Sequence, residues 1–409
     1  MKLTIIGGGP GGYTAAFAAA KAGAEATLIE RAHLGGTCLH TGCIPTKTLR
    51  SSADALDTVA RLREFGIAGD CTATPDMSAI VARKRKVTAT LQTGLEKTAA
   101  QLKVRVVRGD AEFVGAGLVR VASVDGFLEI TGDRVILATG SSPLELPSLP
   151  VDHRLVLSSD DALELQTVPE HLVVVGGGVI GCELAFIYRA FGAKVTVIEG
   201  QGRLLPLPSV DGEISRLLLR EMKKKGIAVE LSHTVSRVTP CDGGAAVEIA
   251  PFPTGAGDSR VLNASAVCVT VGRVPNTAGL AEAGIALDQR GWIVVDDTLE
   301  TSVPGVYAIG DVTGPRRIML AHMAAAEAHM AVHNILHPEK KKVQSYTVVP
   351  SAIFTSPEIG DVGLTEEQAR EQGIAACSAV FQFRELGKAQ AMGALSGLFK
   401  IVAEEGTGK

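Results

Sequence analysis

The sequence lacks a long apolar run and an excess of charge of either sign. A membrane-spanning helix needs about 20 consecutive apolar residues, and no such run is present. The 40 basic and 44 acidic residues give a net charge of −4, so the chain has no electrostatic reason to bind nucleic acid. We therefore predict a soluble protein that contacts neither membrane nor nucleic acid.

A targeting segment and an extracellular cysteine pattern are also missing. The alanine-rich stretch 15–24 could be mistaken for the end of a signal peptide, but the apolar run before it is interrupted by the glycines of 7–12. Five of the seven cysteines are scattered without a pairing pattern: Cys71, Cys182, Cys241, Cys268 and Cys377. Scattered cysteines favour a reducing, cytoplasmic location.

The length of 409 residues suggests about three domains, at a prior of roughly 150 residues per domain. Short basic runs occur at residues 83–86, 223–225 and 340–342. Each lies in or beside a helix-like segment with acidic or apolar neighbours, so we interpret them as solvent-exposed helix faces.

The most informative segment is GGTCLHTGCIPTK at residues 35–47. Pro45 suits the first position of a helix, which would place Cys38 and Cys43 just ahead of an N-terminus that favours a thiolate. Such a pair can cycle between dithiol and disulfide. A purely structural disulfide would close only four intervening residues and stabilise little. The spacing is wrong for zinc and no second Cys/His pair follows, so we expect no metal and favour redox catalysis.

Two segments share one plan: a short apolar strand, a glycine-rich turn, a helix, a second strand and a closing acidic residue. The first has strands at 2–6 and 26–29 and a helix to about residue 21; the second has strands at 172–175 and 194–198 and a helix to about residue 191. In each copy the acidic residue follows the last glycine by 18 positions. Two dinucleotide sites are implied, with the residues Gly7, Gly9, Gly12 and Glu30 in the first and Gly176, Gly178, Gly181 and Glu199 in the second.

Each of these residues has a physical role. The first glycine makes the tight turn, the second lets the backbone approach a pyrophosphate, and the third lets helix and strand pack closely. The carboxylate accepts hydrogen bonds from ribose hydroxyls. Because Cys38 follows Glu30 by only eight residues, the first site should hold a flavin, which exchanges electrons with thiolates and nicotinamides. The second should hold NAD rather than NADP, since Glu199 repels a 2′-phosphate, although Arg203 keeps NADP open.

Further motifs run in order to the end of the chain: ILATGSSP (136–143), VGRVPNT (271–277), YAIGDV (307–312), LAHMAAAEA (320–328) and SAIFTSPEIGDVGLTEEQA (351–369). With these motifs the chain resembles the pyridine nucleotide-disulfide oxidoreductase family, and within it the dihydrolipoamide dehydrogenases. The resemblance implies an α/β fold with two Rossmann-like domains, for FAD and NAD, and a truncated α+β C-terminal interface domain. It divides the chain into a first part of the FAD domain (1–147), an NAD domain (148–270), a central region completing the FAD domain (271–345) and an interface domain (346–409).

The resemblance also implies roles for single residues. Cys43 resembles the sulfur beside the flavin, and Cys38 the interchange thiol that reacts with the substrate. Lys47 resembles the lysine beside flavin N5 and Glu183 its ion-pair partner. Matching positions in the expected FAD site are Gly36, Thr37, Ala111, Thr139, Gly140, Asp311, which would hold the ribityl chain, and Ala321, whose helix would point its N-terminus at the flavin. Val238 and Gly272 match positions in the expected NAD site.

The family completes its site with a C-terminal His-Pro and a following Glu from the other subunit. We expect the sequence given to be incomplete, because it ends at Lys409 before such residues. His337-Pro338-Glu339 is interpreted as a solvent-facing helix end, since it precedes the interface motif at 351. The apparent strand at 398–403, followed by a turn at 404–408, has no partner strand after it.

The implied activity is oxidation of dihydrolipoamide to lipoamide with reduction of NAD through a Cys38–Cys43 disulfide and FAD. The implied partners are a second copy of the chain, in a homodimer, and a lipoyl-bearing protein of a 2-oxoacid dehydrogenase or glycine cleavage complex. One alternative is a related NAD(P)H-dependent disulfide or mercuric reductase. Another is a non-catalytic flavoprotein scaffold or redox sensor.

Overall fold

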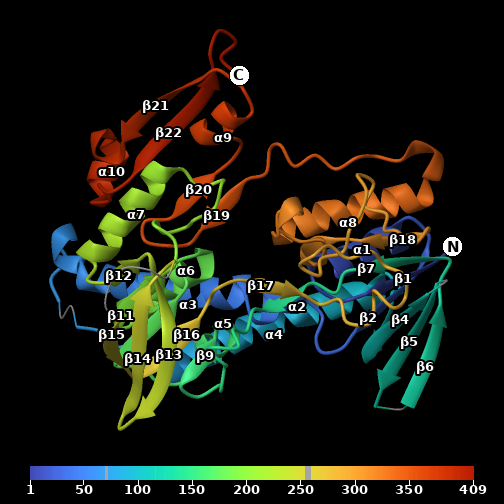
Figure 1. The fold of residues 1–409 in the computed structure, drawn as a ribbon, viewed down its shortest axis with the longest axis horizontal. Coiled ribbons are helices and arrows are strands. Elements are labelled where there is room, and N and C mark those ends of the chain that lie inside the picture. The colour runs from blue at the N-terminus through green and yellow to red at the C-terminus, as the bar shows by residue number, and fades with distance from the viewer. Residues whose placement is uncertain (70–71, 116, 125, 254–258) are drawn as a thin grey trace. The chain divides into compact units, whose positions relative to one another are not determined.

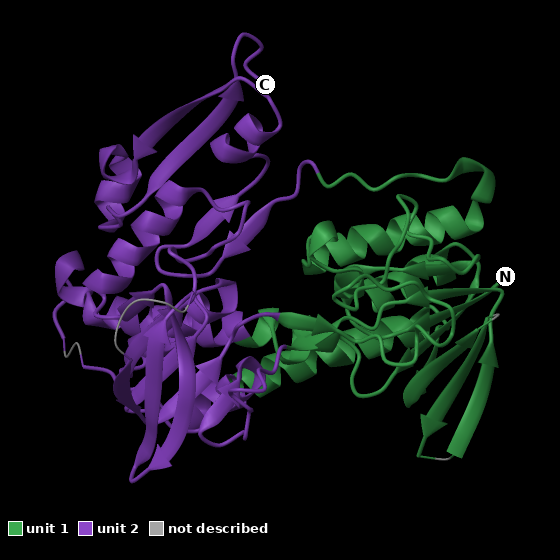
Figure 2. Ribbon diagram, in the orientation of Figure 1, with its two compact units in different colours: residues 1–45, 83–143, 273–346 green, residues 46–82, 144–272, 347–409 purple. Residues whose placement is uncertain are grey.

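The computed structural model describes residues 1–69, 72–115, 117–124, 126–253 and 259–409. The chain forms two compact units, each assembled from three segments of sequence (Figure 2). The first unit comprises residues 1–45, 83–143 and 273–346, and the second comprises residues 46–82, 144–272 and 347–409. The four-part domain division made from the sequence stays a prediction. Cys71 lies outside the described residues.

The first unit is built on a five-stranded parallel sheet in the order β18-β7-β1-β2-β3. Figure 1 labels β18, β7, β1 and β2 of this sheet. Its central strand β1 is buried beyond its first residue, as expected for a parallel strand covered on both faces. Helices α1 and α8 pack through alanines, among them Ala15, Ala19 and Ala331, in one buried cluster. The strands of this sheet are β18 (Val306–Ala308), β7 (Arg134–Leu137), β1 (Lys2–Ile6), β2 (Glu25–Glu30) and β3 (Arg105–Arg108).

The same unit carries smaller antiparallel sheets and several helices. Its helices include α1 (Pro10–Lys21), α2 (Gly36–His40), α8 (Ala321–Leu336) and the short 3-10 helices η2 (Gly310–Thr313), η3 (Pro315–Arg317) and η4 (Pro338–Lys340). Its small sheets are β4 (Asp110–Gly115), β5 (Leu118–Ser123) and β6 (Gly126–Thr131), and β8 (Ser141–Pro143) with β17 (Arg273–Pro275). Two helices, α3 (Cys43–Ala60) and α4 (Met77–Gln101), contribute residues to both units.

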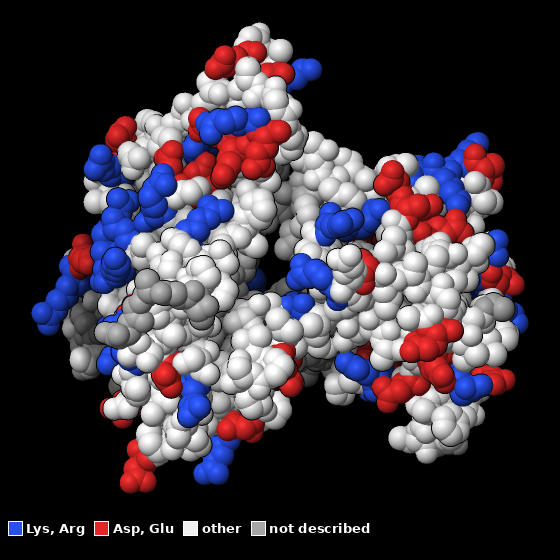
Figure 3. Space-filling model, viewed as in Figure 1, with Lys and Arg blue, Asp and Glu red and all other residues white. Residues whose placement is uncertain are grey.

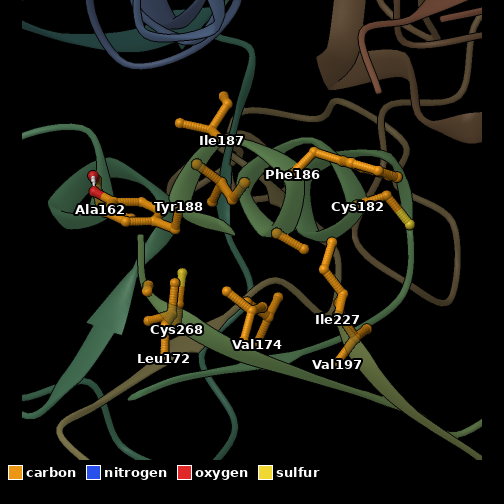
Figure 4. Close-up of a cluster of buried hydrophobic side chains, with 14 of the residues drawn as sticks. Ala162, Leu172, Val174, Cys182, Phe186, Ile187, Tyr188, Val197, Ile227 and Cys268 are labelled. Atoms are coloured by element: carbon orange, nitrogen blue, oxygen red, sulfur yellow. Dashed lines mark hydrogen bonds between the residues drawn. The ribbon is translucent and has the colours of Figure 1, made fainter. Parts of the chain in front are cut away.

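The second unit repeats the parallel sheet in the order β12-β11-β10-β16-β9. All five residues of β10 are buried. The core beneath α6 includes Phe186, Val197 and Cys268 (Figure 4). The buried hydroxyl of Tyr188 donates to the carbonyl of Ala162, which satisfies a polar atom inside an apolar cluster. The strands are β12 (Ala228–Leu231), β11 (Lys194–Glu199), β10 (His171–Val175), β16 (Ala266–Val269) and β9 (Val156–Ser158).

The remaining elements of the second unit are helices and antiparallel strands. The helices are α5 (Ser159–Ala162), α6 (Val179–Ala190), α7 (Gly212–Lys224), α9 (Glu366–Glu371), α10 (Gly387–Met392), η1 (Leu62–Phe65) and η5 (Phe383–Glu385). The antiparallel sheets are β13 (His233–Cys241), β14 (Gly244–Pro251) and β15 (Arg260–Ala264), β19 (Ser351–Ile353) with β20 (Ile359–Asp361), and β21 (Ala376–Gln382) with β22 (Leu398–Glu404).

The structure confirms the α/β class and both strand–turn–helix–strand segments, and it corrects three local expectations. Helix α3 begins at Cys43 rather than Pro45, because a proline is tolerated throughout a first turn whose N–H groups have no intrahelical partner. The strand near residue 400 pairs with β21, which precedes it in the sequence. Lys84, in the first basic run, is buried at 2% exposure rather than solvated.

The other two basic runs are exposed except at Lys225, which is half-buried and paired with Asp57. Lys223 and Lys224 end helix α7, where Figure 3 shows basic side chains gathered. Lys340 is also exposed. Within the part of the chain that the structure describes, no helix has the length and apolar character needed to span a bilayer.

Candidate functional site

The two glycine-rich turns share one hydrogen-bonding pattern. In the first, the N–H of Gly8 donates to Glu30 Oε2 at 2.7 Å. In the second, the N–H of Gly177 donates to Glu199 Oε2 at 2.6 Å. The two carboxylates that the sequence assigns to ribose recognition therefore also fix the shape of the turn beside them.

The third glycine of each motif is required by close packing. A Cβ placed on Gly12 would lie 1.7 Å from the carbonyl oxygen of Gly7. A Cβ on Gly181 would lie 2.0 Å from the carbonyl oxygen of Gly176. No side chain fits at either position, so these glycines let α1 and α6 pack against the strands that precede them.

The middle glycine of each motif has open space instead. A Cβ on Gly9 would meet only the Cα of Gly36, at 3.9 Å, and a Cβ on Gly178 would meet nothing within 4 Å. Both residues are N-caps without a side-chain hydrogen bond, at the starts of α1 and α6. An open backbone cradle at a helix N-terminus fits a dinucleotide pyrophosphate, so the chain's residues fit two dinucleotides.

The redox segment is attached to the first of these turns. The N–H of Gly35 donates to the carbonyl of Gly8 at 2.8 Å. Cys38 follows in α2 and Cys43 opens α3. The two cysteines are half-buried and lie about 2.7 Å apart, which fits a pair that forms a redox disulfide.

The pKa of Tyr13, in α1, is affected by these two sulfurs. Its pKa is raised, mainly by burial and further by the negative charge that Cys38 and Cys43 carry as thiolates. Tyr13 therefore stays a neutral phenol beside the pair.

Asp311, assigned to the ribityl chain, is oriented by side chains from β8 and β17. Ser141 Oγ donates to Asp311 Oδ2 at 2.8 Å and accepts from Arg273 Nε at 2.7 Å. Nearby, Thr139 Oγ1 donates to the carbonyl of Asn276 at 2.7 Å. Gly140 accepts from the N–H of Asn276, so this turn is tied to the chain that follows β17.

A buried glutamate that sequence reasoning missed supports the same region. Glu327 of α8 accepts from the N–H of Gly310 at 2.6 Å and from the hydroxyl of Tyr346 at 2.6 Å. Burial raises its pKa, and these donors oppose that rise. Helix α8 starts at Ala321, as predicted, and through Glu327 it fixes the backbone that carries Asp311.

Lys47 and Glu183 meet in the second unit. Lys47 Nζ lies 3.8 Å from Glu183 Oε1 and 4.0 Å from the centre of the Phe354 ring. The N–H of Phe354 donates to the same Oε1 at 2.8 Å. Burial raises the pKa of Glu183, while Lys47, this N–H and Arg50 oppose the rise. The sequence paired Lys47 with Glu183 but singled out neither Phe354, although it lies in a quoted motif, nor Arg50.

Comparison with protein families gives a match to the pyridine nucleotide-disulphide oxidoreductases over residues 1–328. The dimerisation domain of the same family matches residues 349–409. This chain belongs to that family. It is an FAD-containing disulfide oxidoreductase that uses a pyridine nucleotide, as the sequence predicted.

Several relatives in this family carry a specific name. A dihydrolipoyl dehydrogenase from Geobacillus stearothermophilus is 38% identical over 411 residues, covering 100% of this chain and 84% of the relative. One from Trypanosoma brucei brucei is 37% identical, covering 99% of this chain and 85% of the relative. The resemblance expected from the motifs is thereby confirmed.

Solved structures agree with the fold. LpdA from Mycobacterium tuberculosis has a TM-score of 0.90 at 28% identity, over 100% of this chain and 88% of that one. The HOCl-induced flavoprotein disulfide reductase RclA from Escherichia coli has a TM-score of 0.84 at 30% identity, over 99% and 87%.

The remaining residues that are predicted to contact FAD or NAD lie in different elements of the structure. Gly36 and Thr37 lie in α2, where a Cβ on Gly36 would lie 2.6 Å from Gly9 Cα. Ala111 lies in β4 and Val238 in β13, both in antiparallel sheets. Gly272 has a φ of +132°, which favours glycine. Direct contacts of these residues with FAD or NAD stay predictions.

Proposed function

We propose that this chain oxidises dihydrolipoamide to lipoamide and reduces NAD⁺, as a dihydrolipoyl dehydrogenase. The observation that carries the proposal is the attachment of the Cys38–Cys43 pair to a dinucleotide cradle, through the bond from Gly35 to Gly8. A disulfide beside a flavin site can accept electrons from a dithiol substrate. The named relatives at 36–38% identity support this choice of substrate.

The thiol chemistry falls to the two cysteines. A substrate thiolate attacks Cys38 Sγ, forming a mixed disulfide, and Cys43 leaves as a thiolate. The second substrate thiol then attacks the substrate sulfur, which releases lipoamide and leaves Cys38 reduced. The chemistry that FAD would supply when bound is transfer of this electron pair from the reduced cysteines to NAD⁺. We assign Lys47 to the flavin N5 edge, with Glu183 as its ion-pair partner.

We assign FAD to the first glycine motif, with residues 1–147 and 271–345, and NAD to the second, with residues 148–270. Glu199 supports NAD rather than NADP, because its carboxylate disfavours a 2′-phosphate. The nearby Arg203 donates to the carbonyls of Val210 at 3.0 Å and Leu207 at 2.9 Å. These bonds orient its guanidinium but leave its positive charge in place.

We further propose that residues 346–409 form a homodimer interface. The match to the dimerisation domain supports this. A lipoyl-bearing protein of a 2-oxoacid dehydrogenase or glycine cleavage complex is the partner that would deliver the substrate.

Anaerobic titration of cysteine variants tests the function. Cys43→Ser should lose dihydrolipoamide oxidation and the long-wavelength thiolate–flavin absorbance. Cys38→Ser should lose the oxidation but keep that absorbance, since its Cys43 thiolate persists. Cys241→Ser, at an exposed cysteine in β13, is the matched control and should keep both. Full dihydrolipoamide turnover by Cys38→Ser would exclude the proposal.

A second candidate is a reductase of another disulfide, favoured by the structural likeness to RclA. This activity would show NADH-dependent reduction of a different disulfide and no NADH release from dihydrolipoamide. The same titration, run with dihydrolipoamide and NAD⁺, separates the two.

A further inference from the structure

A cavity of about 520 Å³ lies in the second unit, where helix α7 meets the chain at residues 382–384 and 395–397. Figure 1 shows α7 beside the β21–β22 hairpin, which contains both segments, and Lys400 of β22 pairs with Glu213 of α7 at 3.1 Å. Small-molecule sites typically have volumes of about 300–1,000 Å³. None of the described residues that line the cavity belongs to a glycine motif or to the redox pair. The proposed reaction therefore does not use this cavity.

Hydrogen bonds tie the walls of the cavity together. The N–H of Phe383 donates to the carbonyl of Gly397 at 3.0 Å, which joins the two segments of the hairpin. Gly397 has a φ of +146°, and a Cβ on it would lie 2.6 Å from Cδ2 of Phe383, so only glycine permits this close approach. At the end of α7, Lys224 Nζ donates to Ser396 Oγ at 3.3 Å. These contacts define the shape of the cavity.

The lining of the cavity is positively charged. Arg220 and Lys224 of α7 and Arg384 of η5 line it, and none of its described lining residues is acidic. Lys224 Nζ lies 2.7 Å from Glu221 Oε1, so the charge of this lysine is largely balanced. In the described chain, neither Arg220 nor Arg384 makes a side-chain hydrogen bond or a salt bridge. The cavity therefore presents two permanently charged guanidiniums whose donors are available to a ligand.

The neutral part of the lining indicates an organic ligand. Gln382 supplies a side-chain amide, which can both donate and accept hydrogen bonds. Leu217 and Leu395 supply apolar surface, and Leu395 is 45% exposed although its side chain is large and apolar. Small-molecule sites combine such apolar surface with a few polar groups that fix the orientation of the ligand. An inorganic anion would leave the apolar surface uncovered.

We propose that this cavity binds a small organic molecule that carries at least two negative charges on phosphate or carboxylate groups. Arg220 and Arg384 each bind one anionic group, because the planar fork of a guanidinium matches the oxygens of a phosphate or a carboxylate. The two leucines cover the apolar part of the ligand, and Gln382 orients it. Binding at this site does not depend on the redox reaction.

Isothermal titration calorimetry tests the site with two probes, fructose 1,6-bisphosphate and citrate, which carry phosphate and carboxylate groups respectively. The protein is loaded with FAD and saturated with NAD⁺, so that both dinucleotide cradles are occupied. We expect at least one probe to bind with a Kd below about 1 mM, and neutral fructose not to bind. The probe that binds more tightly identifies the anionic group that the cavity prefers.

Charge variants then locate the binding. Arg220→Gln and Arg384→Gln should each weaken binding about tenfold or more, since each removes charge-assisted hydrogen bonds. Arg220→Lys should retain more affinity than Arg220→Gln, because it keeps the charge. Lys223→Gln is the matched control, because Lys223 is exposed on the same helix but is not among the described lining residues. It should change the Kd less than about twofold, since solvent and salt screen an exposed charge outside the cavity.

Three results would overturn the proposal. The first is a Kd above about 1 mM for both probes, and the second is unchanged binding in both arginine-to-glutamine variants. The third is an equal loss of binding in Lys223→Gln, which would indicate diffuse surface charge. Arg220 and Arg384 are exposed, so their variants should keep the wild-type urea midpoint, which separates lost binding from lost folding. Dihydrolipoamide is absent from every measurement, so failure of the substrate assignment and failure of this site are separate results.

Discussion

Replacing Gly178 by alanine should weaken pyridine-nucleotide binding without unfolding the protein. The added Cβ would meet no protein atom within 4 Å. It would instead occupy the cradle at the start of α6, where the pyrophosphate is expected to approach the backbone. The fold should tolerate the change, because the cost is limited to a poorer N-cap, about 0.5–1 kcal/mol.

The loss of affinity follows from the contacts displaced. Hydrogen bonds from backbone N–H groups to a charged phosphate contribute about 1.5–3 kcal/mol. At 1.4 kcal/mol per factor of ten, the loss of one such bond weakens NADH binding about 10- to 100-fold. Gly181→Ala differs in kind, since its Cβ would lie 2.0 Å from the carbonyl oxygen of Gly176. It should destabilise the fold by about 1–3 kcal/mol or more through overpacking.

The two variants are compared by NADH titration and by urea unfolding, with bound FAD measured in parallel. Gly178→Ala should show the weaker NADH affinity with a near-normal unfolding midpoint and normal FAD content. Gly181→Ala should show the lower unfolding midpoint. Wild-type NADH affinity in Gly178→Ala, or wild-type stability in Gly181→Ala, would refute the assignment of the second turn as a cradle with one open and one packed glycine.

Three further outcomes are expected. Burial raises the pKa of Glu183 above its ordinary 4.5, so the folded protein holds that proton more tightly than the unfolded chain. Between the two pKa values stability falls as pH rises, and urea midpoints of Glu183→Gln should lack that component; identical pH slopes would contradict this. Ser141→Ala removes the 2.8 Å bond to Asp311 and should weaken FAD binding about tenfold, seen as flavin lost on dilution, whereas retained flavin would count against Asp311 as a ligand. Lys400→Met leaves Asp211, Glu213 and Glu366 facing one another without their shared cation, so its unfolding midpoint should drop more at neutral than at acid pH, and an equal drop at both would argue against repulsion.

Much of this molecule could be predicted from the sequence, because it depends on local chemistry. The two glycine motifs, the acidic residue 18 positions after each, and the Cys38–Cys43 pair are short-range patterns. Each turn depends on glycines because a side chain would clash with its backbone, and each strand depends on a continuous apolar run. The strand–turn–helix–strand units and the start of α8 were predicted on that basis and are present.

Contacts between residues that are distant in the sequence could not be predicted in the same way. Glu183 contacts Lys47 of α3 and the N–H of Phe354. Each of these residues is more than 100 positions from Glu183 in the sequence. Spacing along the chain carries no information about such distances, so the N–H of Phe354 was missed. The burial of Lys84 was missed for the same reason.

The sequence alone thus determined the chemistry that lies within one turn or one helix: the cradles, the redox pair and the cofactor class. Tertiary structure decided which distant groups share a low-dielectric environment. It placed the Lys47 ammonium 3.8 Å from the buried Glu183 carboxylate, and burial together with charge at close range sets whether that carboxylate is ionised.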